Sequence, residues 1–255
     1  MTANAPLDAP LLPTEEIPLD GNGAAIGYGK AAITVYRCDI PAQTGVISIP
    51  ESGFSGWSGP LLAADVMVET TGPAFLPSWT TGDNSRLVAT DTMKNFVLHR
   101  ASTFSGTTVE GLAAHVGLAM LATYPDMVRL RVTGRHLPFA SIGTSGLALA
   151  RLPSLGMATT LTIERTGSGP AVTSVGCGLD GLRLARLRGS AFAGFPRDQY
   201  TTLPETSDRP LEIGLFVRWW YEDPANAVAD DLAGWVPPDA VRDLIAAVFD
   251  GTDRE

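Results

Sequence analysis

The order of strand-like and helix-like segments constrains the fold of this chain more than any other feature. Residues 31–39 alternate and are rich in β-formers, and residues 61–70 have a similar pattern, so both are predicted strands. Residues 91–101 and 108–124 carry apolar side chains at helical spacing. Residues 127–133 alternate apolar with basic side chains, as half-buried antiparallel strands do. The first half is therefore predicted to run strand, strand, helix, helix, strand.

The ends of the two helices are also marked in the sequence. Thr90 is placed to cap the first helix, because a threonine oxygen can accept a hydrogen bond from a free N–H group there. Glu110 favours the first turn of the second helix, and Pro125 ends it. The apolar stripe of this second helix consists of Val109, Leu112, Ala113, Val116 and Met120.

The second half of the chain repeats this order in part. A Gly-Ser-Gly-Pro turn separates its first two strands, and Gly251 marks the end of its last helix. The predicted elements are strands over residues 159–165, 172–187 and 211–221, a short helical turn over residues 200–206, and a helix over residues 238–248.

The length of 255 residues suits one large domain or two of ordinary size. We predict a disordered lead-in over residues 1–23, a first unit over residues 24–137 and a second unit over residues 138–255. The second unit stops before the helix and strand that would complete a copy of the first. This division is inferred from the order of elements, because no close sequence repeat accompanies it.

Charge and hydropathy exclude several classes of partner. The net charge of −9 offers no basic face for phosphates, which argues against nucleic acid and anionic lipid. No apolar run approaches the length of a membrane span, and the acidic, proline-rich start is not a signal peptide. We therefore expect a cytoplasmic protein with neither nucleic acid nor membrane as its partner.

The sequence shows no pattern for a metal or a redox cofactor. Three histidines lack metal-site spacing, and Cys38 and Cys177 have no motif around them. A phosphate-binding GxxxxGK[ST] loop is absent, and the glycines of residues 21–27 lack the preceding strand that a dinucleotide fingerprint needs. Any redox chemistry is therefore expected to proceed without metal, haem, flavin or nicotinamide.

Lysine is rare in this chain, which has two lysines against sixteen arginines. Lys30 follows a Gly-Tyr-Gly segment at the start of a strand, and Lys94 closes the polar run of residues 82–94. An ammonium group can change its pKa and transfer a proton, whereas guanidinium stays charged. The counts favour a chemical role for these lysines over compositional drift, which remains the alternative.

Two separate blocks of sequence resemble the urate oxidase family. Tyr28-Gly29-Lys30 with residues 82–85 and 88–95 is similar to the first half of that family, and residues 189–206 with Asp208-Arg209 are similar to its second half. The resemblance spans about residues 26–250. It implies an α+β protein of tandem tunnelling-fold (T-fold) units, in which antiparallel sheets are backed by helices.

The resemblance also implies a set of site residues. Lys30 and Thr90 match the proton-relay pair, and Asp91 matches the position that helps to hold the planar ring. Phe192 matches the aromatic platform, and Arg209 matches the guanidinium that pairs with the substrate's carbonyl and ring nitrogen. These residue types suit proton transfer, stacking and bidentate recognition of an anion. Taken singly, Thr90 could be a helix cap, Phe192 a core residue and Arg209 a carboxylate's partner.

Members of this family oxidise urate with O₂ as co-substrate and without a cofactor. They act in purine metabolism as homodimers or homotetramers with active sites at subunit interfaces, and this is what the resemblance implies here. The family pattern continues with a glutamine-bearing helix and an Asn-Lys-His run that have no counterpart in these 255 residues. We therefore favour a related planar, ionisable heteroaromatic as the substrate, with urate itself as the other candidate.

Two alternatives come from other classes. The chain could be a non-catalytic or half-site subunit of a hetero-oligomeric T-fold assembly, whose partner supplies the strand that this chain lacks. It could also resemble the pterin enzymes of the same fold, which use zinc. The scattered histidines argue against the zinc enzyme.

Overall fold

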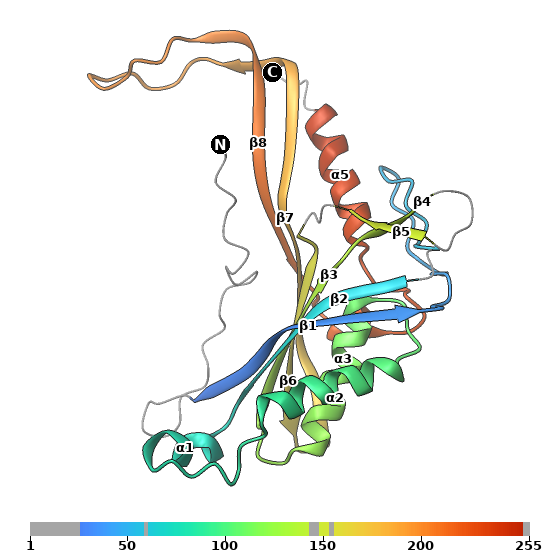
Figure 1. Cartoon of the computed structure of the whole chain (residues 1–255). Helices are drawn as coiled ribbons and strands as arrows, with labels where there is room; N and C mark the ends of the chain where they lie inside the picture. Colours follow the sequence, from blue (N-terminus) through green and yellow to red (C-terminus); the bar gives the residue numbers. More distant parts are fainter. Residues whose placement is uncertain (1–25, 59–60, 143–147, 153–155, 252–255) are drawn as a thin grey trace.

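The long strands of the chain form a single antiparallel sheet in the computed structural model, which describes residues 26–58, 61–142, 148–152 and 156–251 (Figure 1). The order across this sheet is β1-β2-β3-β6-β7-β8, and β4 and β5 pair separately as a small hairpin. The predicted lead-in over residues 1–23 lies outside the described residues. The strands are β1 (Gly27–Cys38), β2 (Leu61–Thr71), β3 (Arg129–His136), β4 (Phe139–Ile142), β5 (Ala148–Arg151), β6 (Ala158–Thr166), β7 (Gly169–Phe192) and β8 (Thr206–Trp220).

Helices cover one face of this sheet. Figure 1 shows α2 and α3 packed side by side against the strands, with α5 alongside β7. The longer helices begin and end within a few residues of their predicted positions. The helical elements are the 3₁₀ turn η1 (Pro73–Phe75), α1 (Leu76–Thr80), α2 (Thr90–Ser102), α3 (Val109–Thr123), α4 (Pro224–Val228) and α5 (Pro238–Gly251).

Helix α3 lies at the centre of the core. Its predicted apolar stripe is buried, and Thr108 caps it by accepting a hydrogen bond from the Gly111 N–H at 3.0 Å. A Cβ atom at Gly117 would lie 2.0 Å from the Ile163 side chain, so the absence of a side chain there allows α3 to approach the sheet closely. This packing of helix on sheet fixes the body of the molecule.

Two local predictions were wrong. Residues 200–206 form a turn and extended chain rather than a helical turn. Thr90 is not a helix cap: the residue at the cap position is Ala89, and no side chain caps α2. The second error matters for the site, because it leaves the Thr90 hydroxyl without the structural task that sequence alone could assign to it.

The β7–β8 hairpin extends far beyond the helix-covered part of the sheet. We call residues 187–210, where β7 ends and β8 begins, the distal hairpin. Figure 1 shows this segment as an arm that turns away from the other strands. Its register shifts between Arg186 and Ser190 and again between Ser190 and Phe192, whereas β2 and β3 pair without a shift. The distal hairpin therefore has no core of its own behind it.

The main sheet is continuous across the predicted boundary between two units. His136 ends β3, and the next strand of the sheet, β6, begins at Ala158 and pairs with β3. The division at residue 137 stays a prediction. Within the described ranges, no helix combines the length and the apolar character that crossing a membrane requires.

Candidate active site

The first group of predicted site residues lies where β1 meets α2. We call residues 28–30 together with residues 82–95 the relay end. Lys30 is half-buried on β1 and precedes a bulge, where the pairing with β2 shifts between Lys30 and Ile33 and Ala32 adopts a positive φ of 56°. A bulge re-aims the side chains beside it, which is common next to active sites. The fold therefore places Lys30 beside a bulge, where the direction of its side chain can differ from that in a regular strand.

Gly29 allows β1 to lie unusually close to β2 at this point. A Cβ atom there would lie 2.1 Å from the Val68 carbonyl oxygen and 2.8 Å from the Glu69 Cα atom. Both of those atoms belong to the backbone and cannot turn aside. The glycine before Lys30 is therefore a requirement of this strand pairing.

Helix α2 begins at Thr90, which is exposed. Because no side chain caps this helix, its first N–H groups and the positive end of its dipole are available to an anion. Helix α2 packs on β1, so Thr90 and Lys30 are carried by elements in direct contact. The position suits a hydroxyl that exchanges protons with a neighbouring ammonium group.

The carboxylate of Asp91 is held by its own helix. Lys94 Nζ lies 2.6 Å from its Oδ1 atom, and Asn95 donates to its Oδ2 atom at 3.0 Å. Lys94 lowers the pKa of Asp91 most, and the charge of Lys30 adds a smaller lowering. Lys30 and Asp91 are therefore within electrostatic range of each other. The second rare lysine thus orients Asp91, a role that its scarcity alone did not reveal.

The second group of predicted residues lies in the distal hairpin. The Arg209 guanidinium carbon lies 5.4 Å from the centre of the Phe192 ring, and Phe192 stacks on Phe195 with ring centres 4.8 Å apart. Phe192 is 42% exposed, so the interpretation of this residue as core is wrong. The guanidinium lies over the Phe192 ring, so an aromatic ring and a cation adjoin at this point of the hairpin. Both groups suit recognition of a planar anion.

Arg209 has an unused hydrogen-bonding group. Its Nε atom is buried and has no hydrogen-bond partner, and none of the ion pairs found among the described residues includes it. The alternative that Arg209 merely pairs with a carboxylate therefore has no support from these contacts. A buried donor without a partner carries a free-energy cost that a bound acceptor would remove.

The structure does not bring the two groups together within one chain. The relay end lies beside α2, whereas the distal hairpin projects from the opposite end of the sheet (Figure 1). Lys30, Thr90 and Asp91 thus form one half of the predicted site, and Phe192 and Arg209 form the other. Sequence reasoning assigned no site role to three neighbouring residues. Asn95 contacts Asp91, Phe195 contacts Phe192, and Tyr28 contacts Val88 just before α2.

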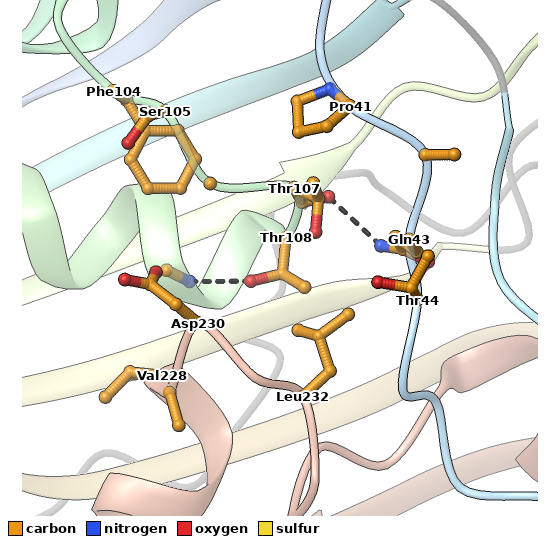
Figure 2. A pocket seen from close by; sticks show the side chains of 14 residues that line it. Pro41, Gln43, Thr44, Phe104, Ser105, Thr107, Thr108, Val228, Asp230 and Leu232 are labelled. Atoms are coloured by element: carbon orange, nitrogen blue, oxygen red, sulfur yellow. Dashed lines mark hydrogen bonds between the residues drawn. The ribbon is translucent and has the colours of Figure 1, made fainter.

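A separate cavity of about 320 Å³ contains none of the predicted site residues. Figure 2 shows it between residues 41–44, the start of α3 and residues 228–232. Gln43 lines it, and its side chain already donates to the Thr107 carbonyl oxygen at 3.1 Å. Asp230 is the charged residue of its lining. In the described part of the chain, no three His, Cys, Asp or Glu side chains are grouped so that they could hold a metal ion.

Comparisons with known proteins agree with the resemblance seen in the sequence. The family model described as Uricase matches residues 175–255. The uricase of Haloferax volcanii is 37% identical over 89% of this chain and 77% of that protein. The uric acid degradation bifunctional protein PucL of Bacillus subtilis is 38% identical over 88% of this chain and 47% of that larger protein.

Solved structures extend the likeness to the fold. A hyperthermostable mutant of the urate oxidase of Bacillus sp. TB-90 superposes with a TM-score of 0.84 at 34% identity, covering 89% of this chain and 79% of that one. A uricase described as from Bacillus fastidious gives a TM-score of 0.84 at 34% identity, with 89% and 74% covered. The predicted α+β tunnelling fold is thereby confirmed. Shared sequence over most of both lengths, on a shared fold, shows that the chain belongs to the uricase family.

Proposed function

We propose that this urate oxidase-like oxidoreductase uses dioxygen to oxidise urate or a related planar, ionisable heteroaromatic. The active site would combine the relay end of one copy with the distal hairpin of a second copy. The observation that carries this proposal is the division of the five site residues into two groups, each locally ordered but at opposite ends of the molecule. The relatives named uricase make urate the first substrate to test.

The relay end would remove a proton from the bound ring. Lys30 would act as the base and Thr90 as the hydroxyl that passes the proton. The free N-terminus of α2 would stabilise the anion that forms. The electron-rich anion then gives two electrons to dioxygen, which takes up two protons and leaves as hydrogen peroxide. This scheme needs no cofactor, because the substrate itself is the reductant.

The distal hairpin would bind and orient the ring. Phe192 offers a partly exposed aromatic ring on which the substrate would stack in place of one of its present neighbours, and Arg209 offers its guanidinium to a carbonyl and a ring nitrogen. Binding by the hairpin and proton transfer by the relay end would then be separate tasks of separate segments. Loss of the hairpin residues and loss of the relay residues should therefore give two different kinetic defects.

Exposed apolar side chains support the use of a second copy. On the distal hairpin, Leu187 is 82% exposed and Tyr200 is 80% exposed, and near the relay end Trp79 of α1 is 68% exposed. Among the described strands, β1 and β8 form the two outer edges of the main sheet. Exposed apolar groups and long open edges are typical of surfaces that a partner covers. A homodimer or homotetramer would cover both.

The test is complementation between two inactive variants. Lys30→Met and Arg209→Gln should each lose at least about a hundredfold in activity on urate under O₂, since a base or an anion-binding group is removed. Mixed as subunits in equal amounts, they should recover roughly a quarter of wild-type activity, because one site in four pairs two intact halves. Urate absorbance and peroxide report the reaction.

Two results would contradict this proposal. A mixture that is inactive, although both variants fold and assemble, would mean that the halves do not meet across copies. A Lys30→Met variant with full activity would remove the relay mechanism. If the purified chain stays monomeric and inactive until a different polypeptide is added, the half-site subunit of a hetero-oligomer becomes the better account.

A further inference from the structure

We propose that Tyr28 is a positioning residue that holds Thr90 in register with Lys30. This inference rests on the proposed function, because it concerns the same proton relay. Tyr28 and Lys30 are two positions apart on β1, so their side chains leave the same face of the strand. The tyrosine hydroxyl accepts a hydrogen bond from the Val88 N–H at 2.9 Å. One short piece of strand therefore carries the base and fixes the segment that leads to its hydroxyl partner.

The position of Val88 gives this hydrogen bond its importance. Val88 immediately precedes Ala89, the cap position of α2, and Thr90 is the first residue of that helix. With no side-chain cap, the start of α2 lacks the local bond that usually fixes a helix entry. The Tyr28 hydroxyl supplies a tie from a neighbouring strand in its place.

Leu87 and Val88 pack against the hydrophobic core, and the other hydrogen bonds and ion pairs of this segment are local or exposed. The N–H groups of Asp83 and Leu87 donate to the carbonyl oxygens of Pro77 and Asn84, and Arg86 forms an exposed ion pair with Asp126. This ion pair joins the segment to Asp126, which precedes β3, and not to β1. Among the described hydrogen bonds and ion pairs of residues 82–89, the hydrogen bond from Val88 is the one that reaches β1.

The Tyr28 ring is itself held firmly. It packs edge-on against Phe75, with ring centres 5.0 Å apart and planes at 89°. Phe75 is almost fully buried in the core. Burial also raises the pKa of the tyrosine, so its hydroxyl stays neutral over ordinary assay conditions. Each residue of the Tyr-Gly-Lys motif thus has its own task. Tyr28 anchors the start of α2, Gly29 allows the close approach of β1 to β2, and Lys30 is the proposed base.

The expected consequence is kinetic rather than structural. A small displacement of a catalytic group can cost a large factor in rate, whereas ring binding in our proposal depends on the distal hairpin. Loss of the Tyr28 hydroxyl should therefore lower kcat and leave KM almost unchanged. The structural alternative, in which Tyr28 only stabilises the body, predicts a lower melting temperature with normal kinetics.

The test compares two tyrosine-to-phenylalanine variants of the full chain with urate as the probe. Tyr28→Phe keeps the ring on Phe75 and removes the hydroxyl, and kcat should fall by about tenfold or more with KM within about twofold. The matched control is Tyr221→Phe, because the Tyr221 hydroxyl also accepts a backbone hydrogen bond, from the Val236 N–H at 2.8 Å. That control should lose melting temperature and keep wild-type kcat.

The outcomes separate this inference from the function beneath it. If Lys30→Met is inactive but Tyr28→Phe keeps kcat within twofold, the positioning role is wrong and the relay stands. If both tyrosine variants lower kcat equally, the effect is general loosening, which also overturns the inference. Full activity of Lys30→Met would instead overturn the proposed function itself. A pH profile of kcat that changes in Tyr28→Phe alone would support the positioning role.

Discussion

The relay end and the distal hairpin are built in opposite ways. At the relay end, β1 pairs with β2 on both sides of one bulge, and α2 packs on β1 with Met93 and Val97 fully buried. The distal hairpin is two strands with repeated register shifts and exposed side chains such as Phe192 and Tyr200. The relay end is therefore supported by the hydrophobic core, whereas the distal hairpin is supported only by the pairing of its own two strands.

This contrast matches what each half would have to do. Proton transfer depends on distances held within fractions of an ångström, which a packed layer of helix and sheet provides. Binding of the substrate ring depends on an apolar face and a cation, and contact with a partner copy can position both of these groups. We infer that changes to the strand packing of the relay end alter stability and rate together, whereas changes in the hairpin alter affinity and assembly.

The largest expected difference comes from matched glycine substitutions at the relay end and on the part of β8 that follows the distal hairpin. Gly29→Ala would place a Cβ atom against the backbone of β2. We expect this variant to lose about 3 kcal/mol in unfolding free energy and most of its activity. Gly214 on β8 has open space around its missing side chain. Gly214→Ala should change stability by less than about 0.5 kcal/mol. Denaturant unfolding and urate turnover measure both effects.

The Gly214→Ala variant controls for a general effect of alanine in a strand. If alanine were harmful in any strand of the sheet, both variants would lose stability. If Gly29→Ala were as stable and active as the wild type, the close approach of β1 to β2 would not govern the relay end. Only a loss confined to Gly29→Ala fits the contrast drawn above.

Low pH should lower the unfolding free energy of the helix-covered part of the sheet through His136. This residue ends β3 and stacks on Trp57 with ring centres 4.6 Å apart, and its Nδ1 atom has no hydrogen-bond partner. Burial lowers the pKa of His136 to about 4. The neutral form is therefore favoured by folding, so its contribution to stability is present above about pH 6.5 and is lost as the pH falls towards 4. The loss at pH 4.5 should be roughly 2 kcal/mol.

His136→Phe keeps a ring on Trp57 and removes the titrating group. Its unfolding free energy should fall less than that of the wild type between pH 7 and pH 4.5, as measured by denaturant unfolding at each pH. The hairpin control is Asp198→Asn, because Asp198 is exposed and its pKa is lowered mainly by the Tyr200 N–H. That control should leave the acid dependence of the body unchanged. Parallel curves for the wild type and His136→Phe would contradict the prediction.

Most of the fold could be predicted because its signals are local. Helix α3 follows from its apolar stripe, the Thr108 cap and Pro125, and strand β3 follows from strict alternation. The distal hairpin was less predictable, since exposed strands without a core carry no strong pattern. The helical turn predicted at residues 200–206 failed for this reason.

The site was predictable only in part. The five proposed residues came from the two sequence blocks, but their separation in space depends on strand order, which no local pattern encodes. The anchor from Tyr28 to Val88 joins residues sixty positions apart, and Asp91 is oriented by Lys94 and Asn95 through contacts visible only in three dimensions. A capping threonine was expected at residue 90 because sequence cannot show which residue begins the helix.

The smallest effect should come from Phe192, and it would sharpen the comparison most. Phe192→Ala removes an exposed stacking face, so KM for urate should rise by about tenfold, as expected for one lost base–aromatic stack, with kcat little changed. The melting temperature should stay within about 1 °C, because this exposed ring packs on Phe195 and Arg209 of the same hairpin rather than on the core. Phe216→Ala, at a ring on β8 that is 71% exposed, is the control and should keep the wild-type KM. If Phe192→Ala instead lowered stability as a core substitution does, the distal hairpin would have to be packed in the free chain, and the two regions would differ less than their contacts indicate.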